Sequence, residues 1–236
     1  MLYHGYKLGW AILDGIFPPR CGGCGSWGTR WCETCQEKVQ LITGELCSFC
    51  GAPLFDHQFK TCFHCRAAGT VFDAVRSWAA FEGPVQKAVH RLKYQRDFGL
   101  AERLSRELIR MIETWGPEFQ LVTAVPLDRR RLQERGFNQA LLLAQPIAWA
   151  FNIPLQPRAL KRVRATVSQV GLSRSERRSN VRNAFCADGK FVGGCAVLIV
   201  DDVMTTGATM DASSQALKKA GAEQVFGVTL ARSMLG

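Results

Sequence analysis

The sequence lacks the features that take a protein into or across a membrane. No uninterrupted apolar run approaches the ~18 residues that a transmembrane helix needs, so we expect no membrane insertion. The N-terminal residues do not follow the basic-then-apolar order of a signal peptide, and the stretch 8–17 is interrupted by Asp14 and Gly15. No small-residue cleavage site follows this stretch. We therefore expect a cytoplasmic protein, in which disulfide bonds are rare.

Internal repeats and low-complexity tracts are also absent, and acidic residues are scarce relative to basic ones. The 236 residues include 30 Lys or Arg and 20 Asp or Glu, a formal net charge of +10. Residues 120–182 alone hold 12 basic and 3 acidic residues, so nearly all the excess charge lies in one segment and serves a local purpose. A hydrophobic content of 47% indicates a globular chain, long enough for one large domain or two small ones.

Cysteine is abundant for a cytoplasmic chain, and it is concentrated near the N-terminus. Eight of the ten cysteines lie between positions 21 and 65 as four C-x-x-C pairs. Two thiolates at this spacing can face one ion, and two such pairs complete a tetrahedral zinc site. Disulfides conflict with the missing export signal, and one redox pair would not need three companions. We predict two structural zinc sites whose ligands are Cys21, Cys24, Cys32, Cys35, Cys47, Cys50, Cys62 and Cys65.

The spacing does not decide how the four pairs combine. Sequential pairing joins the first two pairs in one site and the last two in another, whereas interleaved pairing would cross them. His57 and His64 lie nearby, but the cysteines already satisfy both ions, so we expect neither as a ligand. We expect the remaining Cys186 and Cys195 to be small buried residues. Since about 45 residues form too little core to fold alone, zinc would supply the folding energy.

The hydrophobic pattern changes near residue 70, which divides the chain into an N-terminal helix and cysteine module (1–70) and a second domain (71–236). Strand signals then alternate with helical ones, which indicates parallel βαβ units and an α/β fold with a mainly parallel sheet. In the helical segment that begins at 83, Gly99 could separate two helices. The expected strands are residues 75–81, 121–125, 196–200 and 224–230, and further helices are expected at 139–151 and 211–220.

The sharpest motif follows the buried strand at residues 197–200. Two carboxylates, Asp201 and Asp202, end this run, and a short Thr/Gly loop leads into a helix. Backbone amides and hydroxyls at such a helix start form a phosphate site, and Gly207 permits a close backbone approach. Two acids beside a phosphate site make sense if they bind sugar hydroxyls near a divalent cation. An ordinary strand-to-helix turn is the alternative interpretation.

Residues 197–209 resemble, at every position, the 5-phosphoribosyl-1-pyrophosphate (PRPP) signature of type I phosphoribosyltransferases. The resemblance implies that Asp201 and Asp202 are catalytic carboxylates that hold the ribose hydroxyls, with Mg²⁺ accompanying PRPP. It also implies that the 5-phosphate is bound by Thr205, Thr206, Gly207, Ala208 and Thr209.

Two basic segments precede this motif. The first, residues 129–136, follows the strand 121–125 and suits several anionic oxygens. In the family that the signature resembles, this loop carries the pyrophosphate, which implies Arg131, Arg135 and Gly136 as phosphate ligands. The second segment, residues 169–185, lies where that family keeps a mobile loop. We predict that arginines of both segments form a DNA-binding surface; the alternative is that either segment is only a solvated face. The predicted DNA-binding residues are Arg129, Arg130, Arg131, Arg174, Arg177 and Arg178.

Taken together, the order of these elements resembles the ComF/GntX family of bacterial proteins. The elements are residues 17–21 before the cysteine pairs, residues 92–100, residues 125–139, residues 169–185 and the signature. The resemblance implies an N-terminal double zinc ribbon followed by a type I phosphoribosyltransferase-like domain with a mainly parallel sheet. It also implies a role in natural competence or in the use of DNA as a nutrient. The fold does not by itself establish transferase activity.

Three functions fit these features. The first is the handling of single-stranded DNA during uptake, because a basic groove can follow a polyphosphate backbone, and proteins of the DNA-uptake machinery would be partners. The alternative is an active Mg²⁺-dependent phosphoribosyltransferase with an unidentified acceptor, although no acceptor motif follows Thr209. The third is a zinc-ribbon adaptor whose phosphate-binding domain acts as a sensor. We favour the first, with the PRPP pocket retained.

Overall fold

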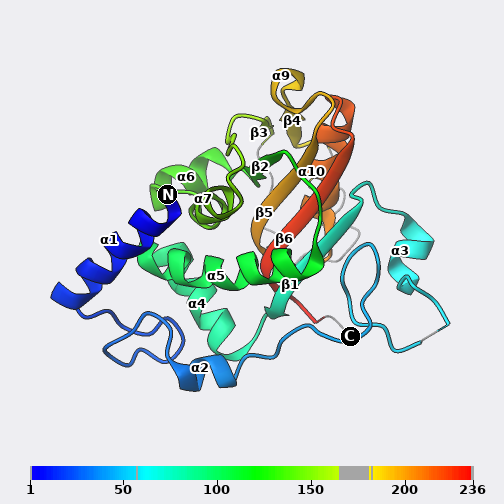
Figure 1. Ribbon diagram of the computed structural model, residues 1–236. Helices are drawn as coiled ribbons and strands as arrows, with labels where there is room; N and C mark the ends of the chain where they lie inside the picture. Colours follow the sequence, from blue (N-terminus) through cyan, green and yellow to red (C-terminus); the bar gives the residue numbers. More distant parts are fainter. Residues whose placement is uncertain (1, 57, 165–180, 182, 235–236) are drawn as a thin grey trace.

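The computed structural model describes residues 2–56, 58–164, 181 and 183–234. Its centre is a sheet of four parallel strands in the order β1-β6-β5-β2 (Figure 1). The strands are β1 (Ala74–Ala80), β2 (Leu121–Ala124), β5 (Ala196–Met204) and β6 (Gln224–Arg232). This parallel sheet confirms the expected α/β class. Two short strands, β3 (Leu160–Arg162) and β4 (Phe185–Ala187), form a separate antiparallel pair that the sequence pattern does not indicate.

Helices precede and connect the strands, largely where the hydrophobic pattern places them. The segment expected to be helical at 139–151 is helical over that range, whereas the last helix begins at Ala208 rather than at Asp211. The described helices are α1 (Leu2–Ile16), α2 (Glu33–Glu37), α3 (Phe63–Ala68), α4 (Gly83–Tyr94), α5 (Phe98–Trp115), α6 (Arg129–Arg135), α7 (Gln139–Phe151), α9 (Gly189–Val192) and α10 (Ala208–Lys219).

The break between α4 and α5 lies at residues 95–97, so the expectation that Gly99 separates two helices is wrong. Asp97 caps α5 by accepting a hydrogen bond from the Leu100 backbone N–H at 3.2 Å. Gly99 sits inside the first turn of α5, where an added Cβ would overlap the guanidinium of Arg30. A glycine is needed there for space rather than for a chain break.

Helices cover both faces of the sheet. On one face, α4, α5 and α7 form a core that includes Leu198 and Val200 of β5. On the other face, α10 and the β3–β4 pair form a core that includes Val197 and Ile199. Because side chains alternate along a strand, β5 is apolar on both sides, as the strands of covered parallel sheets are. The continuous apolar run before the two acids is therefore explained by the burial of both faces of β5.

The cysteine-rich segment passes around the edge of the sheet that β1 forms. Its first half packs into the core on the α4–α5 face, and its second half packs into the core on the α10 face. Between the halves, residues 40–42 run along β1. The Ala80 N–H donates to the Gln40 carbonyl at 2.8 Å, and the Ile42 N–H donates to the Trp78 carbonyl at 3.1 Å. This connection covers an edge strand that would otherwise expose unpaired backbone groups.

Helix α1 lies against α7 and against the first half of the cysteine-rich segment. The Tyr6 ring meets the Trp149 ring of α7 with 4.8 Å between centroids. Asp14 pairs with Arg30, whose guanidinium also pairs with Asp97 at 2.8 Å. These contacts tie α1 to the start of α5. Among the residues that the structure describes, no helix is both long enough and apolar enough to cross a bilayer.

The substitution Gly99→Ala tests the packing of Arg30 against α5. Alanine normally stabilises a helix by about 0.5–1 kcal/mol relative to glycine, but here its Cβ would displace a guanidinium that two carboxylates hold. We expect the free energy of unfolding to fall by about 1–3 kcal/mol in chemical denaturation of the zinc-loaded protein. The control is Gly9→Ala in α1, where nothing lies within 4 Å of the added Cβ. An equal effect of both substitutions would contradict the packing role.

Candidate functional site

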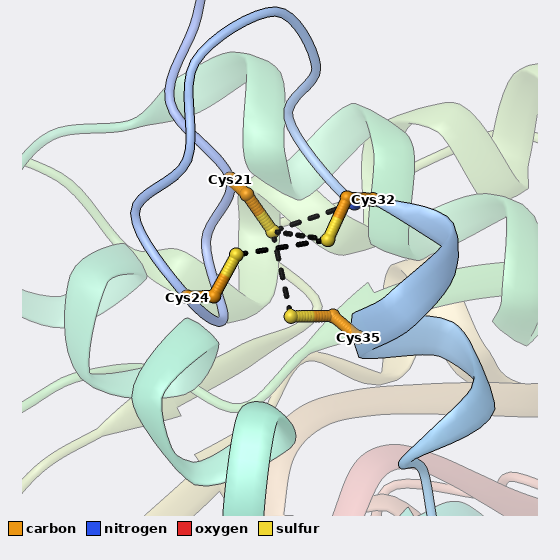
Figure 2. A group of neighbouring side chains, drawn as sticks. All are labelled: Cys21, Cys24, Cys32 and Cys35. Carbon is orange, nitrogen blue, oxygen red and sulfur yellow. Dashed lines mark hydrogen bonds between the residues drawn. The ribbon is translucent and has the colours of Figure 1, made fainter.

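The first four cysteines converge into one tetrad (Figure 2). The Cys21 sulfur lies 3.6 Å from the sulfur atoms of both Cys32 and Cys35, and the Cys24 sulfur lies 3.6 Å from that of Cys32. All four sulfur atoms lie within 4.8 Å of one another. Four thiolates around a zinc ion at about 2.3 Å would stand about 3.8 Å apart, so the tetrad fits this ion.

The last four cysteines of the module form a second tetrad of the same size. The Cys50 and Cys62 sulfur atoms lie 3.7 Å apart, and all four sulfur atoms again lie within 4.8 Å. The structure thus selects the sequential pairing and excludes the interleaved one. His64 belongs to neither tetrad, and His57 lies outside the described residues. The members of the second tetrad are Cys47, Cys50, Cys62 and Cys65.

Polar groups lie close to individual cysteines of both tetrads. The Ser26 hydroxyl, 3.0 Å from the Cys24 sulfur, lowers the pKa of that thiol to about 6. A zinc ion with four thiolates carries a net negative charge, and Arg232 of β6 lies against the second tetrad. Its guanidinium donates to the Cys50 carbonyl at 2.6 Å and to the Cys50 sulfur at 3.5 Å. This arginine offsets the charge and joins the tetrad to the sheet.

The two cysteines outside the tetrads are not buried, so that expectation is wrong. Cys186 is exposed and Cys195 is half-buried. Cys186 is the middle residue of β4, and its neighbour Phe185 faces the core. Strand alternation therefore directs Cys186 outward.

Asp201 and Asp202 lie near the end of β5, at the carboxyl edge of the sheet. The strand continues to Met204, so both acids are strand residues. Asp202 is only 5% exposed, and its Oδ2 atom lies 2.8 Å from the Nζ atom of Lys93 in α4. Ligands of parallel sheets bind outside this edge. The two acids therefore occupy the position in which a functional site is expected.

The two carboxyl groups have opposite pKa shifts. Burial and the neighbouring charge of Asp202 raise the pKa of Asp201 well above its usual value. Burial would also raise the pKa of Asp202, but the Lys93 ammonium outweighs this effect and lowers that pKa. One carboxyl thus retains its proton more readily while the other stays ionised. The pair offers carboxyl oxygens that accept hydrogen bonds, which suits sugar hydroxyls.

The Thr/Gly loop is short and leads directly into α10. Gly207 has a left-handed φ of 81° at the start of this helix, and an added Cβ would meet the Met204 side chain. Thr206 is buried, and its hydroxyl accepts a hydrogen bond of 3.4 Å from the Ala208 N–H. Ala208 and Thr209 belong to the first turn of α10. The predicted phosphate ligands therefore comprise a loop and the N-terminus of a helix, which favours anions.

The segment after β2 forms the helix α6. Asp128 caps it by accepting a hydrogen bond from the Arg130 N–H at 3.0 Å, and a glycine at φ 81° ends it. Arg129 and Arg130 are exposed, and Arg131 is half-buried. Two of the predicted DNA-binding arginines thus face solvent. The other predicted members of that surface, Arg174, Arg177 and Arg178, lie outside the described residues.

Arg135, a predicted phosphate ligand, makes its contacts within the protein. It donates to the Gln139 side-chain oxygen at 2.9 Å. Its guanidinium also lies 5.0 Å from the centre of the Tyr94 ring at the end of α4. Arg135 therefore joins α6 to α4, next to Gly136, which ends α6.

The sequence motifs miss two charged residues of the site, Lys93 and Arg162. Arg162 ends β3, and burial lowers the pKa of its guanidinium while the charges of Asp128 and Asp201 raise it. Its charge also interacts with that of Arg131, so the four groups gather at one edge. No local pattern places Arg162 there, because β3 is held by pairing with β4, a strand from a later part of the chain. Lys93 stands in one of the segments that carry the family resemblance, but its sequence context gives it no role.

Two family models match the chain. The model described as “Double zinc ribbon domain” matches residues 12–66, and “Phosphoribosyl transferase domain” matches residues 138–234. Together with the geometry above, they define the class: a double zinc ribbon with two four-cysteine structural zinc sites, joined to a phosphoribosyltransferase-type domain with a parallel sheet.

Proteins similar in sequence over most of the chain show the family to which it belongs. It is similar to DNA utilization protein YhgH from Escherichia coli O157:H7, with 34% identity over 89% of this chain and 92% of that protein. Competence protein F from Haemophilus influenzae is 31% identical over 86% of this chain and 90% of its own length. The chain belongs to the ComF family. Among solved structures, a purine phosphoribosyltransferase from Pyrococcus horikoshii has 18% identity and a TM-score of 0.35, covering 58% of this chain and 76% of that one.

The substitution Cys21→Ser tests the independence of the two tetrads. It removes one ligand of the first tetrad, so we expect the bound zinc to fall from two ions per chain to one, as measured by elemental analysis. The second tetrad should keep its ion. The exposed Cys186 provides the control, since Cys186→Ser should keep both ions. Retention of both ions by Cys21→Ser would refute the assignment of the first site.

A double-mutant cycle tests the pair of Lys93 and Asp202. We expect Lys93→Met to lower the free energy of unfolding by about 3 kcal/mol or more at neutral pH, because it leaves a buried carboxylate without its partner. Asp202→Asn should lower the free energy of unfolding less. It leaves the Lys93 ammonium without its partner, but the Lys93 side chain is 23% exposed to water whereas the Asp202 side chain is only 7% exposed. The double variant should be more stable than Lys93→Met alone. Additive losses would show that the two groups do not interact.

Proposed function

We propose that this protein serves DNA utilisation by handling single-stranded DNA in the cytoplasm, through a basic surface next to a phosphoribosyl-binding pocket. The observation that carries the proposal is the shared edge of the sheet. There the charge of Arg162 in β3 interacts with those of Asp201 in β5 and Arg131 in α6, and the Thr/Gly loop directly follows β5. The names of the relatives, a DNA utilization protein and a competence protein, support the same role.

The pocket would hold the phosphoribosyl group of PRPP. Asp201 and Asp202 would bind the ribose hydroxyls, and the residues from Thr205 to Thr209 would bind the 5-phosphate through amides and hydroxyls. Carboxylate oxygens are ligands that Mg²⁺ prefers, so the pair also fits this cation, which would offset pyrophosphate charge when bound. The Lys93 ammonium already pairs with Asp202. A ribose hydroxyl would therefore share or replace this contact.

The basic surface would bind the DNA backbone. Arg129 and Arg130 are exposed on α6, although Arg130 pairs with Glu134 at 2.9 Å. Exposed ion pairs are weak, so a phosphate can compete with the glutamate. Proteins of the DNA-uptake machinery would then be partners that deliver or receive the strand.

A titration of labelled single-stranded DNA over a range of salt concentrations tests this proposal. Replacing Arg129, Arg130 and Arg131 with Gln should weaken binding and reduce the salt slope by up to about 2, since each lost phosphate contact contributes about 0.7. A triple variant with Gln at Lys38, Arg110 and Lys190 removes the same charge from exposed positions elsewhere and should bind normally. Equal weakening by both variants, or binding without salt dependence, would overturn the proposal.

The same titration, repeated with PRPP and Mg²⁺, shows whether a ligand in the pocket changes the affinity of the basic surface for single-stranded DNA. PRPP should bind the parent protein, and Asp202→Asn should weaken it by removing an ionised acceptor. Unchanged PRPP affinity in this variant would exclude the carboxylate pair as the ribose site.

An active phosphoribosyltransferase is the second candidate function. The adjacent carboxyl groups of Asp201 and Asp202 favour it, since the ammonium of Lys93 lies 2.8 Å from Asp202 and the two pKa values shift in opposite directions, an arrangement typical of catalytic sites. The enzyme would transfer ribose 5-phosphate from PRPP to an unidentified acceptor. Pyrophosphate release in a screen of acceptors would support transfer, and its absence with intact PRPP binding would leave binding as the function.

A further inference from the structure

A cavity of about 370 Å³ opens on α4, next to the carboxylate pair but not part of it. This volume lies within the range of about 300–1,000 Å³ that small-molecule sites occupy. Lys93 lines the cavity and also reaches the Asp202 carboxylate at 2.8 Å. One side chain therefore joins the cavity to the proposed ribose site. We name it the α4 cavity; its lining includes Phe81, Lys87, Val89, His90, Lys93 and Tyr94.

The α4 cavity is built at the ligand-binding edge of the sheet. Phe81 directly follows β1, and its N–H donates to the Arg232 carbonyl at the end of β6 at 2.7 Å. Val89 is buried and half-buried Phe81 faces the same space. Lys87, His90 and Tyr94 are three or four positions apart, so they share one face of α4. The cavity thus has an apolar base and a polar, aromatic rim.

The rim holds an exposed aromatic ring in a fixed place. Tyr94 is 60% exposed, yet groups from two helices contact its ring. The His90 ring lies 4.6 Å away on α4, and the Arg135 guanidinium lies 5.0 Å away on α6. A tyrosine held in this way provides a stacking surface for a planar ring without a large ordering cost.

The charge of the rim indicates what kind of ring fits. Lys87 and Lys93 contribute ammonium groups, which only donate hydrogen bonds, and Gln86 adds an amide that can donate and accept. No acidic side chain lines the cavity among the described residues. The complementary ligand is a planar ring whose edge carries hydrogen-bond acceptors. Its attachment to a ribose would place the sugar toward Asp202, since Lys93 spans the two places.

We propose that the α4 cavity binds a nucleobase, stacked on Tyr94 and contacted at its edge by the lysines. The inference rests on the proposed function, because it assumes that Asp201 and Asp202 hold a ribose. The base could be a free ring that accepts ribose 5-phosphate or a base of the DNA strand. Both sources share the same chemistry, and the experiment below separates them.

The test compares Tyr94→Ala with the conservative Tyr94→Phe and with Phe55→Ala, whose ring is 93% exposed in the second ribbon. The probes are a short DNA oligonucleotide, an abasic oligonucleotide of equal length, and free nucleobases with PRPP present. Tyr94→Ala should weaken binding of base-containing probes about tenfold or more, because stacking on an aromatic side chain has that value. Binding of the abasic oligonucleotide and of PRPP should stay unchanged, and the two other variants should behave as the parent.

Each outcome has one meaning. A loss confined to the oligonucleotide identifies the DNA strand as the source of the base, and a loss for a free base identifies an acceptor; either supports the proposal. Unchanged affinity of Tyr94→Ala for all probes, or parent protein that binds the abasic and base-containing strands equally and binds no free base, overturns it. PRPP binding by the parent is measured separately, so its failure would count against the ribose site and not against the stacking site.

A second measurement does not depend on any substitution. An oligonucleotide that carries 5-iodouracil can be cross-linked by light to an aromatic side chain that stacks on it. Peptide mapping should locate the cross-link at Tyr94 or His90 in the parent protein. A cross-link confined to aromatic residues outside the α4 cavity would refute the site.

Discussion

The two cysteine tetrads are the constraint on which the rest of this structure depends. Residues between the first and last of these cysteines form too little apolar core to fold alone, so bound zinc must fix their turns. Once fixed, the two halves pack on opposite faces of the sheet, and residues 40–42 cover β1 between them. The metal sites therefore order more than a small domain: they fix the segment 21–65 as a clamp that encloses the edge strand β1.

This clamp is connected by two routes to the edge of the sheet that carries Asp201 and Asp202. On one face, Gly23 of the first ribbon packs against Pro84 at the start of α4, and the last turn of the same helix carries Lys93 to Asp202. On the other face, Arg232 bonds to Cys50 of the second tetrad and pairs in register with the last residue of β5. Both routes end beside the two carboxylates. The ribbons thus support this edge of the sheet from either side.

Much of this could be read from local sequence because the relevant groups are close together along the chain. The C-x-x-C spacing predicts metal pairs, and the run from 197 to 209 predicts a strand, two acids and an anion-binding helix start. The signals that failed were also local. Gly99 marks a space for Arg30 and not a helix break, and Cys186 faces outward because β4 alternates. A single residue type does not reveal which neighbour it will meet.

The sequence by itself determined the parallel α/β class, the eight cysteines of the two metal sites and the position of the carboxylates before the Thr/Gly loop, since each rests on periodicity or on spacing within one segment. Only the tertiary structure decided how the cysteine pairs combine, and it alone brought Lys93, Arg162 and Tyr94 to the edge of the sheet. These placements depend on packing between segments far apart in the chain. The opposite pKa shifts of Asp201 and Asp202 arise from the same cause, because only folding buries these strand residues and brings Lys93 of helix α4 next to Asp202.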